Sequence, residues 1–255
     1  MFISINEASK LLGISPTTIR RLEENGQVKG YGIRVHYTPG GQRRYSVAEI
    51  EQYFISRGFF GKIGFGKSPV LLVVDCINAF TSKESPMHGD WNKEVENIND
   101  LVYAAHKTDC PVIFSHSYYE DGDPGLTIWA KKIEGMKALT PDSSWVQLDN
   151  RIKQKKNDIH IYSKYVSIYY QSTLLNELRK HNCDTLIICG FSTSGAIRAV
   201  SAETIQYGIR PIVPMEAVGD RDEHVHRNNL SDLDRKFADV LSVAEVIQYL
   251  FGRTK

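Results

Sequence analysis

The sequence predicts a three-layer, doubly wound α/β domain with a parallel sheet, preceded by a small winged helix-turn-helix domain. From residue 69 onward, short apolar runs alternate with amphipathic helical stretches, which is typical of a parallel sheet covered by helices. Before that point, two short helical segments meet at a glycine and a hairpin-like stretch follows them, as in a helix-turn-helix with a wing.

The strands of the α/β part are predicted from buried apolar runs bounded by polar or turn residues. They lie near residues 70–75, 111–116, 159–163, 185–190, 210–214 and 239–242, with helices in most of the intervals. In open parallel sheets ligands bind beyond the carboxyl ends of the strands. Polar residues that directly follow a strand are therefore the candidates for chemistry.

The N-terminal helices are marked by their end signals. A first helix runs to a break at Gly13, and Ser15-Pro16 opens a second helix that is expected to stop at Gly26. The second helix buries Ile19 and Leu22 on one face.

The wing is predicted from two short runs joined by a turn. Residues 35–37 and 42–45 flank Thr38-Pro39-Gly40-Gly41, which favours a β-hairpin. Ser46 then caps a helix that reaches Phe54. We therefore expect domains at residues 1–54 and 69–255, joined by a glycine-rich linker over residues 55–68.

Charge is divided unequally between these parts. The chain has 255 residues with 31 Lys and Arg against 30 Asp and Glu, yet residues 1–68 hold 10 against 5. The remaining residues therefore hold 21 against 25. A basic module on an otherwise acidic protein indicates a polyanionic partner for the first segment.

The four cysteines and the apolar runs indicate a cytoplasmic protein. The cysteines lack CxxC or Cys/His ligand spacing, and the run Val70–Val74 is too short to span a bilayer. We expect no membrane partner, no cofactor and no metal.

Residues 2–54 resemble the MerR-type, or excisionase-like, winged helix-turn-helix. The resemblance implies binding to double-stranded operator DNA, with phosphate and base contacts from the second helix and the wing. The residues implied are Thr17, Thr18, Arg20, Arg21, Arg43, Arg44 and Tyr45. The alternative is that the arginines form a solvated helix face. Because the linker shows no heptads, we expect any homodimer to form through the second domain.

Residues 69–250 resemble the isochorismatase-like cysteine hydrolase family, and within it the N-carbamoylsarcosine amidase and maleamate amidohydrolase members. Three motifs carry the resemblance: Leu72–Phe80, Tyr162–Ser167 and Cys189–Ala199. The first implies that Asp75 is a general base, and the second implies that Lys164 lies beside it. The third implies that backbone N–H groups around Ser192 and Thr193, often at a cis peptide, stabilise an oxyanion.

Three further residues are expected in the ligand pocket. Arg221 matches the arginine that the amidases use to hold a substrate carboxylate or carbonyl, and Tyr165 and Trp129 are candidates for the pocket wall. The alternative for Arg221 is a surface ion pair with Asp220 or Asp222.

The sequence departs from the family at the nucleophile. The pattern Gly-x-x-Thr-x-x-Cys requires cysteine where this chain has Ala196, so the chain as written is expected to be inactive in cysteine-dependent amide hydrolysis. Either the cysteine was replaced by engineering, or the chain is a natural pseudoenzyme that senses a ligand. Retention of the other motif residues, Lys164 among them, favours engineering.

These observations predict a transcription regulator in which the α/β domain binds a small amide or ureido acid. The alternative is a cytoplasmic amidohydrolase that releases ammonia from a small amide and in which the helix-turn-helix is only accessory. A third reading is a pseudoenzyme that serves only as a dimerisation scaffold.

Overall fold

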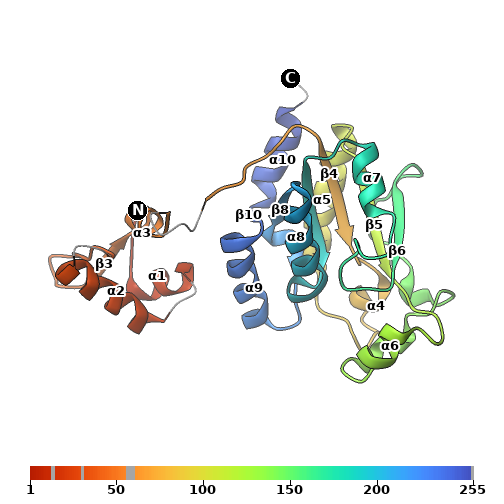
Figure 1. Ribbon diagram of the computed structural model, residues 1–255, viewed down its shortest axis with the longest axis horizontal. Coiled ribbons are helices and arrows are strands. Elements are labelled where there is room, and N and C mark those ends of the chain that lie inside the picture. The colour runs from red at the N-terminus through yellow and green to blue at the C-terminus, as the bar shows by residue number, and fades with distance from the viewer. Residues whose placement is uncertain (13–14, 30–31, 56–60, 254–255) are drawn as a thin grey trace. The chain divides into compact units, whose positions relative to one another are not determined.

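The computed structural model describes residues 1–12, 15–29, 32–55 and 61–253 (Figure 1). The described chain forms two compact units, one largely from Met1–Lys62 and the other largely from Ile63–Lys255. The predicted helix break at Gly13 lies outside the described residues. No helix in the described ranges is long and apolar enough to cross a bilayer.

The N-terminal unit is a winged helix-turn-helix. Its three-stranded antiparallel sheet has the order β1-β3-β2, and β2 and β3 form the predicted hairpin, with His36 opposite Arg44. Ser15 caps the second helix by accepting a hydrogen bond from the Thr18 N–H at 3.1 Å. The elements are β1 (Phe2–Ile3), α1 (Ile5–Leu12), α2 (Pro16–Lys29), β2 (His36–Tyr37), β3 (Arg43–Ser46) and α3 (Val47–Ile55).

The second helix is longer than predicted. α2 continues through Gly26 to Lys29, so the expected stop at this glycine is wrong. A glycine inside a helix costs only about 1 kcal/mol relative to alanine. The packing of Ile19 in the core of this unit, together with Leu22 against it, holds the helix in spite of that cost.

The larger unit has a parallel sheet with strand order β10-β8-β7-β4-β5-β6, and β9 pairs with β7. The chain reverses its direction of winding between β4 and β7, which is where doubly wound sheets bind ligands. The strands are β4 (Pro69–Val74), β5 (Val112–Ser117), β6 (Ile159–Ser163), β7 (Thr185–Phe191), β8 (Arg210–Pro214), β9 (Val218–Gly219) and β10 (Asp239–Leu241).

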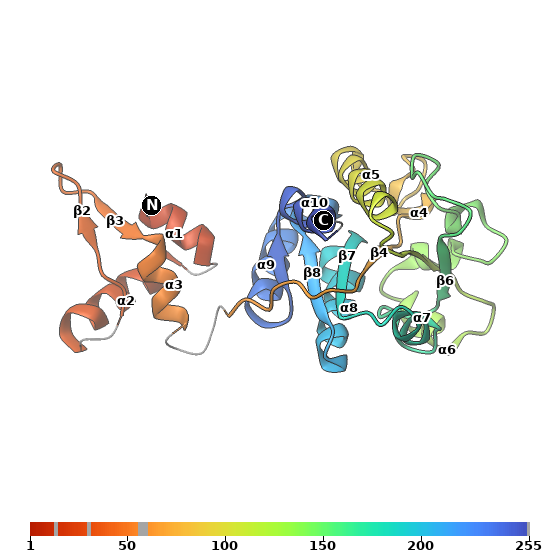
Figure 2. The ribbon, with the colours of Figure 1, turned by 90° about the horizontal axis from the view of Figure 1, so that it is seen from above.

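Helices cover both faces of this sheet. Figure 2 shows α5 and α10 on one face and α7 and α8 on the other, which confirms the three-layer prediction. The helices are α4 (Asn78–Thr81), α5 (Asn92–Lys107), α6 (Pro124–Trp129), α7 (Leu174–Lys180), α8 (Arg198–Thr204), α9 (Glu223–Lys236) and α10 (Val243–Gly252). The six predicted strands agree with the structure to within one residue at their ends, and the two central ones, β4 and β7, are completely buried apolar runs.

One glycine lets the two central strands approach at their carboxyl ends. Gly190 has φ +109°, and a Cβ placed on it would lie 2.0 Å from the carbonyl oxygen of Val74. Only glycine fits here, because both the backbone conformation and the space exclude a side chain. This close approach lies one residue before Asp75.

Residues 63–68 of the predicted linker form hydrogen bonds to the α/β unit, and residues 56–60 of it lie outside the described residues. The N–H groups of Ile63 and Gly64 donate to the carboxylate of Asp239 at 3.1 and 2.7 Å. Those of Lys67 and Ser68 donate to Asp184 at 2.8 and 3.0 Å. Two carboxylates therefore anchor residues 63–68 at the amino ends of the strands.

Candidate functional site

A cavity of about 220 Å³ opens at the carboxyl ends of β4, β5 and β7. Its polar wall contains Asp75, Ser117, Ser192, Ser194, Asp220 and Arg221. Its apolar wall contains Phe80, Met87, Trp91, Tyr119, Trp129, Ile133, Met136, Tyr165, Val166, Phe191 and Ala196, with Gly195 beside them. The cavity is smaller than most drug-binding sites, which suits a small metabolite.

Asp75 lies in this wall directly after β4. Its backbone has φ +48°, an uncommon conformation for an aspartate, and its side chain is 7% exposed. The hydroxyl of Ser115 donates to Oδ1 at 3.0 Å and that of Ser117 donates to Oδ2 at 2.6 Å. The pKa of the Asp75 carboxyl is raised, because its burial outweighs these hydrogen bonds.

Lys164 does not lie beside Asp75, contrary to what the resemblance implies. Its Nζ is 2.5 Å from Oε2 of Glu120 and 3.1 Å from Oδ1 of Asp123, and it is not part of the cavity wall. These carboxylates, Glu120 above all, raise the pKa of the Lys164 ammonium. The lysine therefore stays charged outside the cavity.

Strand alternation explains this placement. Ser163 ends β6 on its buried face and pairs in register with Ser117, whose hydroxyl bonds to Asp75. In a strand successive side chains point to opposite faces, so residue 163 faces the Asp75 side and the residue after it points away. The lysine is thus one residue out of register with the cavity.

The loop after β7 carries the predicted oxyanion residues. The peptide bond between Phe191 and Ser192 is cis, and residues Thr193–Ile197 form a π-helical turn that leads into α8. Ser192 and Ala196 line the cavity. Thr193 is fully buried outside it, and its hydroxyl contacts Nδ1 of His226 at 2.9 Å.

None of the four cysteines replaces the missing thiol, because none lines the cavity. Burial raises the pKa of Cys110 and of Cys183 to about 12, and it also raises those of Cys76 and Cys189. A thiol with a raised pKa holds its proton and is a poor nucleophile.

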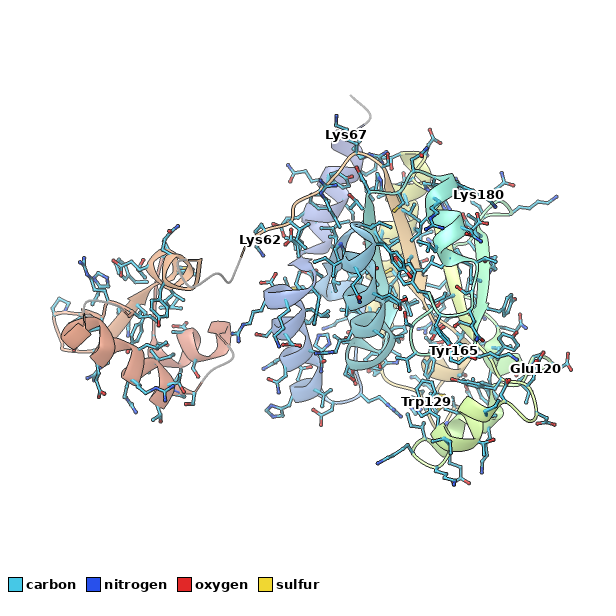
Figure 3. The ribbon with its side chains drawn as sticks, viewed as in Figure 1. Lys62, Lys67, Glu120, Trp129, Tyr165 and Lys180 are labelled. Carbon is cyan, nitrogen blue, oxygen red and sulfur yellow. The ribbon has the colours of Figure 1, made fainter. Side chains whose placement is uncertain are left out.

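The three predicted pocket residues all line the cavity, and Figure 3 shows Tyr165 and Trp129 at the same end of the α/β unit as Glu120. Arg221 is exposed and forms no ion pair with any residue in the described ranges. Asp220 instead accepts from the Ser194 N–H at 2.7 Å, and Asp222 caps α9. The alternative of an Arg221 ion pair with either aspartate is therefore wrong.

Most of the apolar wall was not predicted. Met87 and Trp91 come from irregular segments and Met136 from a short 3-10 helix (Glu134–Ala138), whose conformations no periodicity indicates. Ser117 and Asp220 could have been found, because each directly follows or ends a strand. The indole N–H of Trp91 donates to the Phe80 carbonyl at 2.8 Å, which fixes its ring in the wall.

The predicted DNA-contacting residues lie on two elements, the helix α2 and the wing formed by β2 and β3. Thr17, Arg20 and Arg21 are exposed on α2, and the Thr18 hydroxyl contacts the capping Ser15 at 3.0 Å. Arg44 donates to Gln42 at 3.2 Å in the wing.

Tyr45 cannot contact DNA, which corrects the prediction for this residue. Its side chain is fully buried, and its hydroxyl donates to Oε2 of Glu23 at 3.1 Å. Arg43 Nε lies 3.3 Å from the same oxygen. Burial, above all, raises the pKa of Tyr45 to about 12. Glu23 therefore holds the wing against α2 from inside the unit.

We expect Tyr45→Phe to destabilise the N-terminal unit by about 1.5–3 kcal/mol, because it removes a donor from a buried carboxylate. Hydrogen exchange of residues 1–55 would measure the loss. Tyr37→Phe is the control, because Tyr37 is exposed. Equal protection in the two variants would contradict the structural role of this hydroxyl.

We expect Asp75→Asn to stabilise the folded protein at pH 8 by about 1–2 kcal/mol, as substitutions at strained functional sites commonly do. The raised pKa means that the folded state holds this proton more tightly than the unfolded state does. The parent therefore loses stability as pH rises from about 4 through the folded pKa, and the variant does not.

Denaturation at several pH values would show the difference between parent and variant growing with pH. Asp121→Asn is the matched control, because Asp121 is exposed. A parent that is more stable than the Asp75→Asn variant at pH 8 would contradict the effect of burial.

Comparison with known proteins places this geometry in a family. Residues 69–245 match the family described as "Isochorismatase domain". The chain belongs to the isochorismatase family. Residues 2–58 match a family described as "Helix-turn-helix domain", so this isochorismatase family member also carries an N-terminal helix-turn-helix domain.

Two curated relatives are amidohydrolases by name. The chain is 32% identical over 200 residues to "N-carbamoylsarcosine amidase" of an Arthrobacter species, covering 76% of this chain and 75% of the relative. It is 29% identical over 199 residues to "Maleamate amidohydrolase" of Pseudomonas putida, covering 76% and 92%. Both alignments are long enough to span most of the α/β unit.

Solved structures support the fold of this unit. A cysteine hydrolase from Pseudomonas syringae pv. phaseolicola superposes with a TM-score of 0.71 at 17% identity, covering 76% of this chain and 98% of that chain. N-carbamoylsarcosine amidase from Thermoplasma acidophilum gives a TM-score of 0.60 at 21% identity, covering 69% and 96%.

Proposed function

We propose that this protein is a DNA-binding transcription regulator whose isochorismatase domain binds a small ligand and does not cleave it. The observation that carries the proposal is the cavity itself: a buried aspartate remains at its wall, but neither a thiol nor an ammonium group accompanies it. The helix-turn-helix domain on the same chain supplies a DNA-binding activity that a bound ligand can regulate.

The absence of catalysis is inferred from the nucleophile position and from the position of the nearby cation. In cysteine-dependent amide hydrolysis a base takes the thiol proton, and a nearby cation favours the thiolate. Here Ala196 presents a methyl group to the cavity, and Lys164 is held outside it by Glu120 and Asp123. Because both the nucleophile and the cation are out of place, the retained Lys164 no longer supports the view that only a cysteine was replaced.

The ligand class is inferred from the wall and from the relatives. Arg221 is exposed, forms no ion pair among the described residues, and lines the cavity, where its guanidinium can hold a carboxylate by two hydrogen bonds. The substrates in the names of the two curated relatives are small carboxylate-bearing amides. We therefore propose a small acid with an amide-like, planar end as the ligand.

DNA binding is assigned to the exposed face of α2. Arg20 and Arg21 are exposed, whereas Arg43 is tied to Glu23, so α2 provides the main phosphate contacts and the wing contributes through Arg44. The module is of the MerR type in our proposal. Its two copies in a homodimer would meet the half-sites of a pseudo-palindromic operator.

A second candidate is an amidohydrolase with an accessory helix-turn-helix. The retained Asp75 and the cis peptide before Ser192 favour it, because both belong to the implied catalytic loop and base. This candidate requires that restoring a cysteine at position 196 restores turnover.

The test begins with selection of DNA from a random or genomic library by the full chain at physiological salt. We expect a specific site whose binding Arg20→Ala/Arg21→Ala weakens by about tenfold or more and with a shallower salt dependence. Lys131→Ala/Lys132→Ala, in the α/β unit, is the charge-matched control.

The regulatory part is tested by titrating that site with and without small amide, ureido and guanidino acids. A ligand alters DNA affinity only when it binds one state of the protein more tightly than the other. Unchanged DNA affinity at saturating concentrations of every acid that binds the cavity would contradict the proposal.

A further inference from the structure

We infer that the ligand of this cavity is a zwitterion, with a planar guanidinium group that meets Asp75 and a carboxylate that meets Arg221. The inference rests on the proposed function, because it names the ligand class of the same site. It differs from the neutral amide end that the curated relatives' names indicate.

The cavity wall carries more carboxylates than cationic groups. Among the described residues that line it, Asp75 and Asp220 bear carboxylates, and Arg221 alone bears a cationic group. The Asp220 carboxylate accepts from the Ser194 N–H, and Arg221 is exposed. The buried Asp75 is therefore left without a countercharge from the protein, and a cationic ligand group would supply one.

The hydrogen bonds of Asp75 leave room for such a group. Each carboxylate oxygen accepts one hydroxyl, from Ser115 and from Ser117. An ionised carboxylate offers about four acceptor positions. A guanidinium can bind the remaining positions with two parallel N–H groups and brings a positive charge. A urea can make the same two hydrogen bonds, but it brings no countercharge to the buried carboxylate.

Aromatic side chains form much of the surrounding wall. Tyr119, Trp91 and Phe191 are almost completely buried, Trp91 stacks on Phe191 with centroids 4.9 Å apart, and Tyr119 meets Trp129 edge to face. Cations are attracted to aromatic faces, most strongly where water is excluded. The wall therefore favours a cation over a neutral group of the same shape.

The experiment uses a matched pair of probes on the full chain. Guanidinoacetate and N-carbamoylglycine have the same number of non-hydrogen atoms and the same carboxylate, and they differ in whether the planar end is a guanidinium or a urea. We expect guanidinoacetate to bind at least about tenfold more tightly, measured by calorimetry or by the change in tryptophan fluorescence, to which Trp91 and Trp129 in the wall contribute.

Asp75→Asn should remove this preference, since an amide gives no countercharge. Arg221→Met should weaken both probes to a similar extent, because both carry the carboxylate. Circular dichroism of each variant establishes that it is folded, and Asp121→Asn is the control for a lost surface charge.

Tighter binding of N-carbamoylglycine, or a guanidinium preference that persists in Asp75→Asn, would overturn the inference and leave the proposed function standing. Failure of both probes to bind at millimolar concentration would also overturn it. The proposed function would be contradicted separately, by a bound acid that leaves DNA affinity unchanged.

Discussion

Ala196→Cys alone is expected to leave ammonia release from N-carbamoylsarcosine and maleamate near the background rate. Ala196→Cys/Ser163→Lys should release ammonia about 100-fold faster than the single variant, the order of gain expected from a positioned acid–base group. The reason is geometric: residue 163 lies on the Asp75 side of β6, whereas Lys164 is bound to Glu120 and Asp123. Two strand spacings, roughly 10 Å, separate β6 from β4. The side chains of a lysine at position 163 and of Asp75 can span this gap together, because both lie on the same face of β5.

Two further variants make this comparison decisive. Ala196→Cys/Ser163→Met controls for the added volume, and it should remain at background. If Ala196→Cys alone turns over either amide efficiently and loses that turnover with Lys164→Met, then Lys164 does serve the site. The amidohydrolase candidate would replace the regulator that binds without cleaving.

Gly190→Ala is expected to destabilise the α/β unit by about 4 kcal/mol or more, a size reserved for steric conflict in a core. The new Cβ would lie 2.0 Å from the Val74 carbonyl oxygen, and alanine disfavours φ +109°. Because β4 and β7 are the central pair of the sheet, they cannot separate without disrupting the hydrogen bonds between them. Chemical denaturation would measure the loss.

Gly208→Ala separates the two causes of this loss. Gly208 has φ +73° but nothing within 4 Å of its Cβ position, so its substitution carries backbone strain and no clash. We expect a cost of about 1–2 kcal/mol there. Equal losses at both positions would show that contact with Val74 contributes nothing.

The sequence was sufficient to predict what depends on continuous patterns. The central strands are buried apolar runs, and Asp75 follows the first of them, so the sheet and the position of this carboxylate could be predicted. Ser15-Pro16 likewise marked the start of α2. Each of these signals depends only on residues close together in the sequence, and the local preference agrees with the conformation that the fold requires.

Two site predictions were wrong because a shift of one residue along a strand decides whether a side chain points into the unit or away from it. Lys164 and Tyr45 each lie next to a residue on the opposite face, and the sequence does not show which of the two neighbours points inward. The helix α2 passes Gly26 because tertiary packing outweighs a local preference. The apolar cavity wall depends on short elements and irregular segments, far apart in the sequence, that meet only in the folded chain.

The helix α9 joins two ends of the sheet that serve different purposes. Asp220 and Arg221 belong to the cavity wall, Asp222 caps α9, and its 14 residues span about 21 Å to the segment that leads into Asp239. Asp239 in turn holds the N–H groups of Ile63 and Gly64. One helix therefore connects the cavity wall at Arg221 to the carboxylate that anchors residues 63 and 64 on the α/β unit.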